Sequence, residues 1–247
     1  MLTDIDGRSD VDGVYHLGDL VGYAPWPDGV VAVLRQRAIP GVAGNYDSTT
    51  AADYEHCGCR YEDPVQEELS HLSYEWTRAN VSAETKRWLG SLPFRIDIRP
   101  LGGHAAGPRL ILVHGSPVLN TVYWTEDRSD DFCMKMAAQL GAKAGDTVAF
   151  GHTHKPWRRA VAGICFVNTG SVGRPKDGDW RAAYVLVEMV GREDVDVELV
   201  RVEYDLGRAV AAIRKSGLPD DLAEHLETGG ISKRLGYGSR LSRRGPG

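Results

Sequence analysis

The chain has 247 residues, a formal net charge of -5 at pH 7 and 42% hydrophobic residues. This length suffices for one well-buried α/β domain, and the mildly acidic balance argues against a nucleic-acid partner, which would need a basic surplus. The sequence contains no run of 18 apolar residues and does not begin with a basic and then apolar signal pattern. We therefore predict a soluble, cytoplasmic protein with no membrane partner.

The first residues are too few for a complete strand and crossover. Asp4 and Asp6 lie in a short segment that ends at Gly7, and only six residues separate Gly7 from the next apolar strand at Val14. A crossover between parallel strands needs a dozen or more residues. We expect residues 1–12 to form the end of a crossover helix and its loop.

Four short apolar segments each end in a side chain that can bind a metal, and three of them pass through a glycine first. They are Val14–Leu17 before Gly18 and Asp19, Pro40–Ala43 before Gly44 and Asn45, Leu110–Val113 before His114, and Val148–Phe150 before Gly151, His152, Thr153 and His154. Strand ends of this kind meet at one edge of an α/β sheet. Taken singly, each side chain is equally typical of a turn or an exposed strand end.

The last of these segments carries two imidazoles within three residues. Alternate residues of a strand lie on one face, so His152 and His154 are predicted to point the same way if the backbone stays extended. Gly151 permits a bend and a close approach of the backbone to a bound ion or phosphate. An exposed polar pair at a strand end is the simpler alternative for an isolated motif of this kind.

The remaining elements follow from periodicity and capping residues. We predict helices over 28–37, from Asp47 onward, within 53–80 with a stripe of Leu69, Leu72 and Trp76, and over 82–89, 129–140, 206–215 and 219–226. We predict strands over 94–98, paired with 110–114 through Gly102 and Gly103, over 160–167 with Gly163 near the turn, and over 182–189 and 195–204.

Two further stretches have plain interpretations. Cys133 and Cys165 are predicted to be buried thiols, and the isolated pair Cys57 and Cys59 is a weak zinc motif in a reducing compartment. Residues 229–247 are rich in glycine and basic side chains, which predicts a disordered basic tail after a single domain spanning 1–228.

The ordered motifs carry a family resemblance. The set Gly18-Asp19, Gly44-Asn45, His114-Gly115 and Gly151-His152-Thr153-His154 resembles the calcineurin-like metallophosphoesterase superfamily, and the flanking 18–25 and 168–173 resemble its bacterial phosphodiesterase-like branch. The resemblance covers about Val11 to Tyr204. It implies a four-layer αββα sandwich of two mixed β-sheets flanked by helices.

The resemblance also implies two divalent ions, for which the carboxylate, amide and imidazole donors suit Mn, Fe or Zn. Asp19 would bridge the ions, and Asn45, His114 and His152 would complete one half-site. His154 would belong to the other half-site, whose remaining ligands are a D-x-H pair that we expect to be missing, or encoded ahead of Met1. Water held between such ions can attack phosphorus in line.

One departure from the family motif concerns catalysis. Tyr46 follows Asn45 where the family usually has a histidine that helps the leaving group depart. A phenol donates a hydrogen bond but is a weaker acid than imidazolium, so the resemblance predicts Tyr46 and Asp19 as catalytic residues and substrates with good leaving groups.

Two functional classes follow. The first is a metal-dependent phosphodiesterase or phosphatase that acts on a small phosphate ester or nucleotide. The alternative is a degenerate, catalytically weak family member that acts as a metal-binding or regulatory interaction module. The missing D-x-H pair favours the second class, and the five surviving ligand-type residues favour the first.

Overall fold

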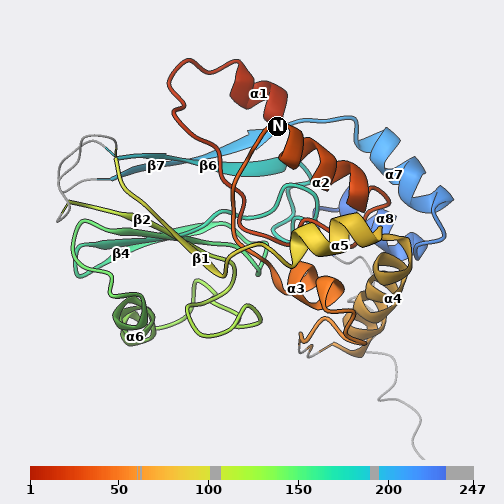
Figure 1. The fold of residues 1–247 in the computed structure, drawn as a ribbon, viewed down its shortest axis with the longest axis horizontal. Coiled ribbons are helices and arrows are strands. Elements are labelled where there is room, and N and C mark those ends of the chain that lie inside the picture. Colours follow the sequence, from red (N-terminus) through yellow and green to blue (C-terminus); the bar gives the residue numbers. More distant parts are fainter. Residues whose placement is uncertain (60, 62, 101–106, 190–194, 232–247) are drawn as a thin grey trace, which may run out of the picture.

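The computed structural model describes residues 1–59, 61, 63–100, 107–189 and 195–231. Two β-sheets lie face to face, α6 (Asp130–Leu140) covers the outer face of the larger sheet, and most of the other helices gather at one end (Figure 1). This arrangement confirms the predicted α/β fold of two sheets with helices outside. The turn predicted at Gly102 and Gly103 and nearly all of the predicted tail lie outside the described residues.

The larger sheet is mixed and has the strand order β1-β2-β3-β5-β4. Its strands are β1 (Arg95–Ile98), β2 (Leu110–Val113), β3 (Thr147–Phe150), β5 (Ile164–Asn168) and β4 (Trp157–Val161). The three central strands β2, β3 and β5 are parallel, and the edge strands β1 and β4 run antiparallel to their neighbours. The C-terminal ends of β2 and β3 therefore lie at the same edge of the sheet, and His114 and His152 follow these ends in the chain.

The smaller sheet is an antiparallel pair, β6 (Ala182–Glu188) with β7 (Asp196–Val202), and so is not mixed. Between the sheets lies a core built around Val42, Leu112, Ala149 and Val167, with Val185 and Val197 contributed by the smaller sheet. The other face of the larger sheet packs on α6, where Trp124 stacks on Phe150 with ring centroids 4.3 Å apart. Both faces of β3 are thus buried, which explains its uninterrupted apolar sequence.

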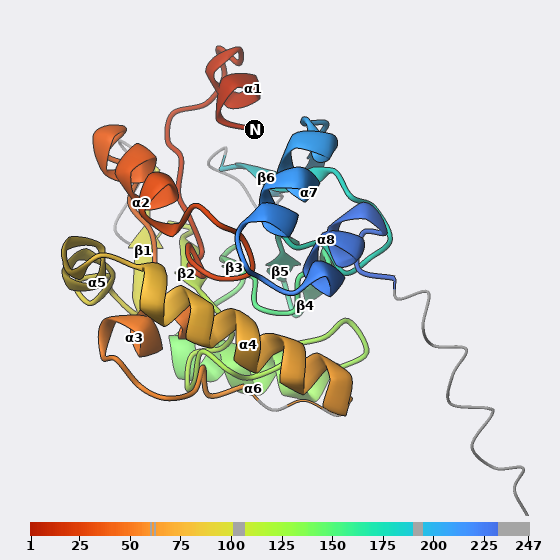
Figure 2. The same ribbon diagram turned by 90° about the vertical axis from the view of Figure 1, so that its right-hand side faces the viewer.

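The remaining helices are α1 (Leu2–Asp6), α2 (Pro27–Gln36), α3 (Asn45–Ala51), α4 (Pro64–Asn80), α5 (Ala83–Leu89), α7 (Leu206–Lys215) and α8 (Asp220–Glu227). Figure 2 shows α4 between α3 and α5 on one side and α7 and α8 on the other. Leu69 and Trp76 of α4 pack on α7 and α8, as predicted, whereas Leu72 is 41% exposed. None of the described helices combines the length and the apolar character needed to cross a lipid bilayer.

Capping explains where several helices begin. Ser82 and Ser129 accept hydrogen bonds from the backbone amides of Thr85 and Phe132, which confirms both predicted starts. Helix α3 begins at Asn45, two residues before the predicted start, because the Asp47 carboxylate accepts a hydrogen bond from the amide of Gly44.

The N-terminal residues form the short helix α1 and a loop. Asp4 accepts a hydrogen bond from the hydroxyl of Tyr184 at 2.6 Å, and Asp6 forms an ion pair with Arg37 at 2.8 Å. These carboxylates are therefore engaged away from the strand ends that carry His114 and His152.

The predicted strands over 14–17 and 40–43 are wrong, because the two segments share only one parallel bridge, between His16 and Gly41. Neighbouring backbone groups have other partners. The carbonyl of Leu17 accepts from the His114 ring, and the carbonyl of Ala43 accepts from the side chain of Asn120. The amides of Gly18 and Gly44, which would donate the next ladder bonds, bond instead to His16 Nδ1 at 3.3 Å and to the Asp47 carboxylate at 2.9 Å, so the pairing stops there.

A buried carboxylate connects the starts of β2 and β3. Asp146 has no exposed surface and accepts hydrogen bonds from the Arg109 backbone amide at 2.8 Å, from Arg109 Nη2 at 2.7 Å and from the amide of Lys143 at 3.1 Å. Burial alone would raise the pKa of Asp146, but these donors and the Arg109 charge lower it below its usual value.

We expect Asp146→Asn to lower the free energy of unfolding by about 3 kcal/mol at pH 7, because it removes the fully buried one of the two charged partners of the mostly buried Arg109. The matched control is Asp97→Asn, which removes the 32% exposed partner of the same arginine and should cost less than about 1 kcal/mol. A carboxyl group whose pKa is lowered by folding stabilises the fold at pH values above its pKa in the unfolded chain, about 3.9. This stabilisation is lost as the pH falls below that value. Urea unfolding should therefore show the Asp146→Asn difference shrink between pH 7 and pH 3, and a constant difference would contradict this assignment.

Candidate metal centre

His114, at the end of β2, is oriented by one backbone hydrogen bond. Its Nδ1 lies 2.6 Å from the carbonyl oxygen of Leu17, and the side chain is 2% exposed. A carbonyl oxygen only accepts hydrogen bonds, so Nδ1 carries the proton, as inferred from this geometry. In the neutral ring, the lone pair is therefore on Nε2, which faces the other ligand-type side chains.

Three further ligand-type atoms converge on His114 Nε2. Asn45 Oδ1 lies at 3.2 Å, His152 Nδ1 at 3.2 Å and Asp19 Oδ2 at 3.3 Å. Single ligand atoms of Asp19, His114 and His152 all lie within 4.8 Å of one another. The structure thus brings together four of the predicted metal ligands, from the ends of four different segments.

This cluster favours a positive charge. Burial lowers the pKa of His114, but the neighbouring carboxylate of Asp19 reverses the effect and raises it. Burial likewise raises the pKa of Asp19, and the charge of His114 overrides it and lowers the pKa to about 2. A proton can supply the positive charge, and so can a divalent ion, for which one carboxylate, one amide oxygen and two imidazoles are a fitting donor set.

Asn45 is held with its oxygen toward this cluster. Its Nδ2 donates to the carbonyl of Cys57 and to Cys59 Sγ, each at 3.2 Å, which leaves Oδ1 for His114. The cysteine pair, interpreted above as a weak zinc motif, therefore orients a candidate ligand, and no cluster of metal ligands in the described residues includes a cysteine. Cys133 and Cys165 are buried free thiols, as predicted.

The loops of Asp19 and Asn45 are in direct contact through glycine. Gly18 has φ +85° and Asp19 has φ +52°, which turns the carboxylate toward α3. A Cβ at Gly44 would overlap the carboxylate and the backbone nitrogen of Asp19. The amide of Tyr46 donates to Asp19 Oδ1 at 2.9 Å, so that Oδ2 remains free to face His114.

Asp47 joins the same two loops, a role that sequence reasoning missed. Its fully buried carboxylate accepts hydrogen bonds from the amides of Leu20 and Gly44, both at 2.9 Å. Burial and the nearby charge of Asp19 raise the pKa of Asp47 to about 6. A sequence signal was present, since an acidic residue three positions after a helix cap commonly bonds back to it.

The extended backbone on which the predicted common direction of His152 and His154 depends is absent. Strand β3 ends at Phe150, and both histidines have φ +60°, because Asn168 Nδ2 bonds to the Gly151 carbonyl at 2.7 Å and holds the turn. His152 joins His114, whereas His154 Nδ1 donates to the carbonyl of Arg174 at 2.8 Å. Within the described residues, His154 is not part of the cluster of Asp19, His114 and His152.

Tyr46 does not bring its phenol to the metal ligands. The side chain is 1% exposed, and its hydroxyl donates to the carbonyl of Ser70 at 3.2 Å. The ring packs edge-on against Tyr74, with centroids 5.4 Å apart, in the core beneath α3 and α4. This placement gives Tyr46 a packing role and does not support the predicted role at the leaving group.

We therefore expect Tyr46→Phe to leave the ratio of alkyl to nitrophenyl phosphate hydrolysis unchanged, and to lower the free energy of unfolding by about 1 kcal/mol through the lost hydrogen bond. Steady-state kinetics on both ester types and a urea titration test this. A selective loss on the alkyl ester, whose leaving group needs more help, would return the phenol to the reaction.

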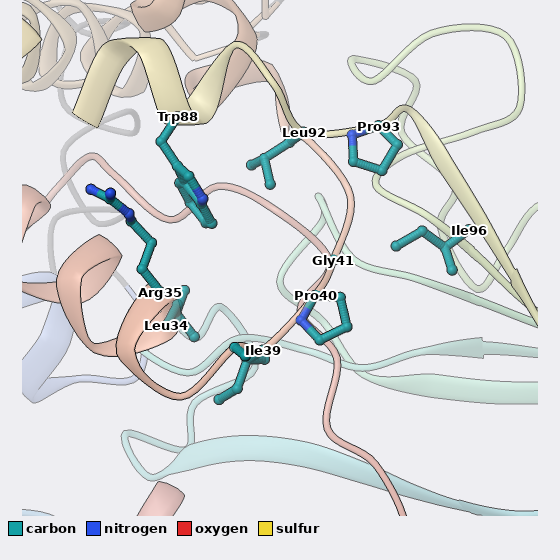
Figure 3. Close-up of a pocket in the computed structure, with 10 residues that line it drawn as sticks. Leu34, Arg35, Ile39, Pro40, Gly41, Trp88, Leu92, Pro93 and Ile96 are labelled. Carbon is teal, nitrogen blue, oxygen red and sulfur yellow. The ribbon is translucent and has the colours of Figure 1, made fainter. Parts of the chain in front are cut away.

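A hollow of about 400 Å³ lies away from this cluster, between α2, α5 and β1 (Figure 3). The residues that line it are Leu34, Arg35, Ala38, Ile39, Pro40, Gly41, Trp88, Leu92, Pro93 and Ile96. The one charged residue among them, Arg35, forms an ion pair with Glu84 at 2.6 Å. The residues that line the hollow include no metal ligand. We therefore place the candidate site at the strand ends and not in the hollow.

Comparisons with known proteins agree with this geometry. An uncharacterized protein of Methanocaldococcus jannaschii is 28% identical over 246 residues, which cover 93% of this chain and 91% of that protein. A crystal structure of a metallophosphoesterase from Sphaerobacter thermophilus is 27% identical, with a TM-score of 0.67 and 92% of each chain covered. A hypothetical protein of Pyrococcus horikoshii shares the fold, with 20% identity, a TM-score of 0.74, and 94% of this chain and 90% of that one covered.

The family model of the calcineurin-like phosphoesterase superfamily domain matches residues 2–192 of this chain. This range contains Asp19, Asn45, His114 and His152, the four side chains that converge, and also His154. Proteins of this superfamily are generally hydrolases that depend on divalent metal ions. The chain belongs to the calcineurin-like phosphoesterase superfamily.

Proposed function

We propose that this protein hydrolyses a small phosphate ester or nucleotide by metal-dependent attack of water on phosphorus. The observation that carries the proposal is the convergence of Asn45 Oδ1, His152 Nδ1 and Asp19 Oδ2 on His114 Nε2 at 3.2 to 3.3 Å. One carboxylate, one amide oxygen and two imidazoles form a donor set in which a divalent ion would be stabilised. A hydrolase of this superfamily needs such a charge at its reacting phosphate.

Asp19, Asn45, His114 and His152 would hold one ion of Mn, Fe or Zn, and Asp19 with His154 would contribute to a second. Such ions supply acidified water near neutral pH and offset the charge on a phosphate. The hydrogen bond from His114 Nδ1 to Leu17 fixes the ring, and Asp47 holds the Asp19 and Gly44 loops together. Hydrogen-bond partners of this kind fix the orientation of the metal ligands and raise the affinity for the metal ion.

One set of measurements distinguishes the proposed hydrolase from the alternative, a metal-binding or regulatory interaction module. The full chain is stripped with a chelator, reloaded with Mn²⁺, Fe²⁺ or Zn²⁺, and assayed with a nitrophenyl monoester, a bis(nitrophenyl) diester and a panel of nucleotides. We expect turnover only in the presence of a divalent ion, and none in His152→Ala. Tight metal binding without turnover on any ester would favour the module, and a lack of metal binding would reject both.

A further inference from the structure

Arg174 is a buried cation without an anionic partner. Arg174 lies between β5 and β6 and is 7% exposed. Its guanidinium carbon stacks over the ring of Tyr23, 3.5 Å from the ring centroid. Within the described part of the chain, its Nε is shielded from solvent without a hydrogen-bond partner, and none of the ion pairs found there includes Arg174. Burying an unpaired charge is costly, so its presence calls for an anion that the protein chain does not supply.

A second cation lies two residues further along. Lys176 is half-buried and lies within electrostatic reach of Arg174, Asp19 and Cys59. No ion pair to Lys176 is formed by the residues that the structure describes. Two positive side chains without a salt-bridge partner thus lie together beside a candidate metal ligand.

The segment that carries both cations is held rigidly against His154. The carbonyl of Arg174 accepts from His154 Nδ1 at 2.8 Å, and the amide of Lys176 donates to the carbonyl of His154 at 3.3 Å. On its other side, the carbonyl of Pro175 accepts from His225 Nε2 at 3.1 Å. The cations are therefore positioned before any ligand arrives, which favours tight recognition.

We propose that Arg174 and Lys176 form an anion subsite that binds the doubly charged phosphate of a monoester, or the terminal phosphate of an anhydride, in preference to a singly charged diester. This inference rests on the proposed function and deepens it by naming the substrate class. The guanidinium offers a planar pair of donors that matches phosphate oxygens, and the ammonium adds a point charge. Two cations favour a charge of -2 over a charge of -1, since the attraction scales with the product of the charges.

The placement of Tyr46 supports this assignment. The motif position that usually supplies an imidazole near the leaving group holds a phenol that points into the core. The cluster of Asp19, Asn45, His114 and His152 therefore receives no organic cation from α3. Arg174 and Lys176 supply positive charge from the segment that contacts His154.

The test measures phosphate binding apart from turnover. Inorganic phosphate is titrated by calorimetry into the full chain in the presence of Mn²⁺, and KM is measured for the nitrophenyl monoester and the bis(nitrophenyl) diester. The variants are Arg174→Gln and Lys176→Gln. The matched controls, Arg208→Gln and Lys215→Gln, each remove one exposed positive charge from α7.

We expect each subsite variant to weaken phosphate binding about 10-fold and to raise KM for the monoester by a similar factor, because one charge-assisted contact is worth about that much. KM for the diester should change less than about 3-fold, and the controls should match the parent chain. Arg174→Lys, which keeps the charge but not the planar donor pair, should lose less phosphate binding than Arg174→Gln. Phosphate affinities equal to those of the controls would overturn the subsite.

A structural role for Arg174 predicts a different pattern. If the side chain serves only to pack on Tyr23, Arg174→Gln and Arg174→Met should both lower the melting temperature and leave phosphate affinity unchanged, which would overturn the proposal. An unpaired functional cation predicts an unchanged or higher melting temperature in both. If the parent chain hydrolyses no ester but the variants lose phosphate binding, the subsite stands and the proposed function is rejected. If the variants remain active and bind phosphate as tightly as the parent chain, only the subsite is rejected.

Discussion

Replacing His114 with alanine is expected to weaken divalent metal binding at least about 100-fold and to remove esterase activity. Partners that only support metal ligands are already worth about 10- to 100-fold in affinity, and His114 Nε2 is the atom on which the three other ligand atoms converge. The variant also leaves the carbonyl of Leu17 without its donor. Metal content by mass spectrometry and calorimetric titration with Mn²⁺ measure the effect.

His152→Ala should produce a loss of the same order, because it removes the second imidazole of the same cluster. The control is His71→Ala, which removes an exposed imidazole of α4 that pairs with Glu75 at 3.2 Å. That control should retain the metal stoichiometry of the parent chain. Metal retention in both cluster variants, at the parent stoichiometry, would remove the basis of the proposed function.

Gly44→Ala is the second substitution with a large expected effect. The added methyl group would overlap the carboxylate and the backbone nitrogen of Asp19, and neither loop can move without breaking the bonds of Asp47 to Leu20 and Gly44. We expect a loss of about 3 kcal/mol in the free energy of unfolding, as for an overpacked buried site. Metal affinity should also fall, because Asp19 Oδ2 is displaced from His114.

Gly173→Ala serves as the control for Gly44→Ala. A Cβ at Gly173 meets no atom within 4 Å, so this variant should change the free energy of unfolding by less than about 0.5 kcal/mol. Gly44 has φ -83°, which alanine adopts readily, so its cost is steric and not conformational. Equal stabilities for the two variants would show that the Asp19 and Gly44 loops are not in the contact described.

Local sequence patterns predicted most of the elements. The bounds of α7 were predicted without error, and α2, α5, α6 and the strands from β1 to β7 were predicted within a few residues, because capping residues and apolar periodicity act over one or two turns. The same patterns failed over 14–17 and 40–43, where apolar runs led to strand predictions. There the pairing stops at one bridge, because the amides of Gly18 and Gly44 bond to the side chains of His16 and Asp47.

The candidate ligands Asp19, Asn45, His114 and His152 could be named from sequence because each follows an apolar segment, although only the segments before His114 and His152 are parallel strands. Sequence by itself thus determined which residues can hold a metal and which superfamily the chain resembles. Only the tertiary structure decided the directions of His154 and Tyr46 and the burial of Arg174. These depend on the φ of +60° at His154, on the core beneath α3 and on the ring of Tyr23. Each is set by contacts between distant segments, whose energies exceed the local preferences that a sequence pattern records.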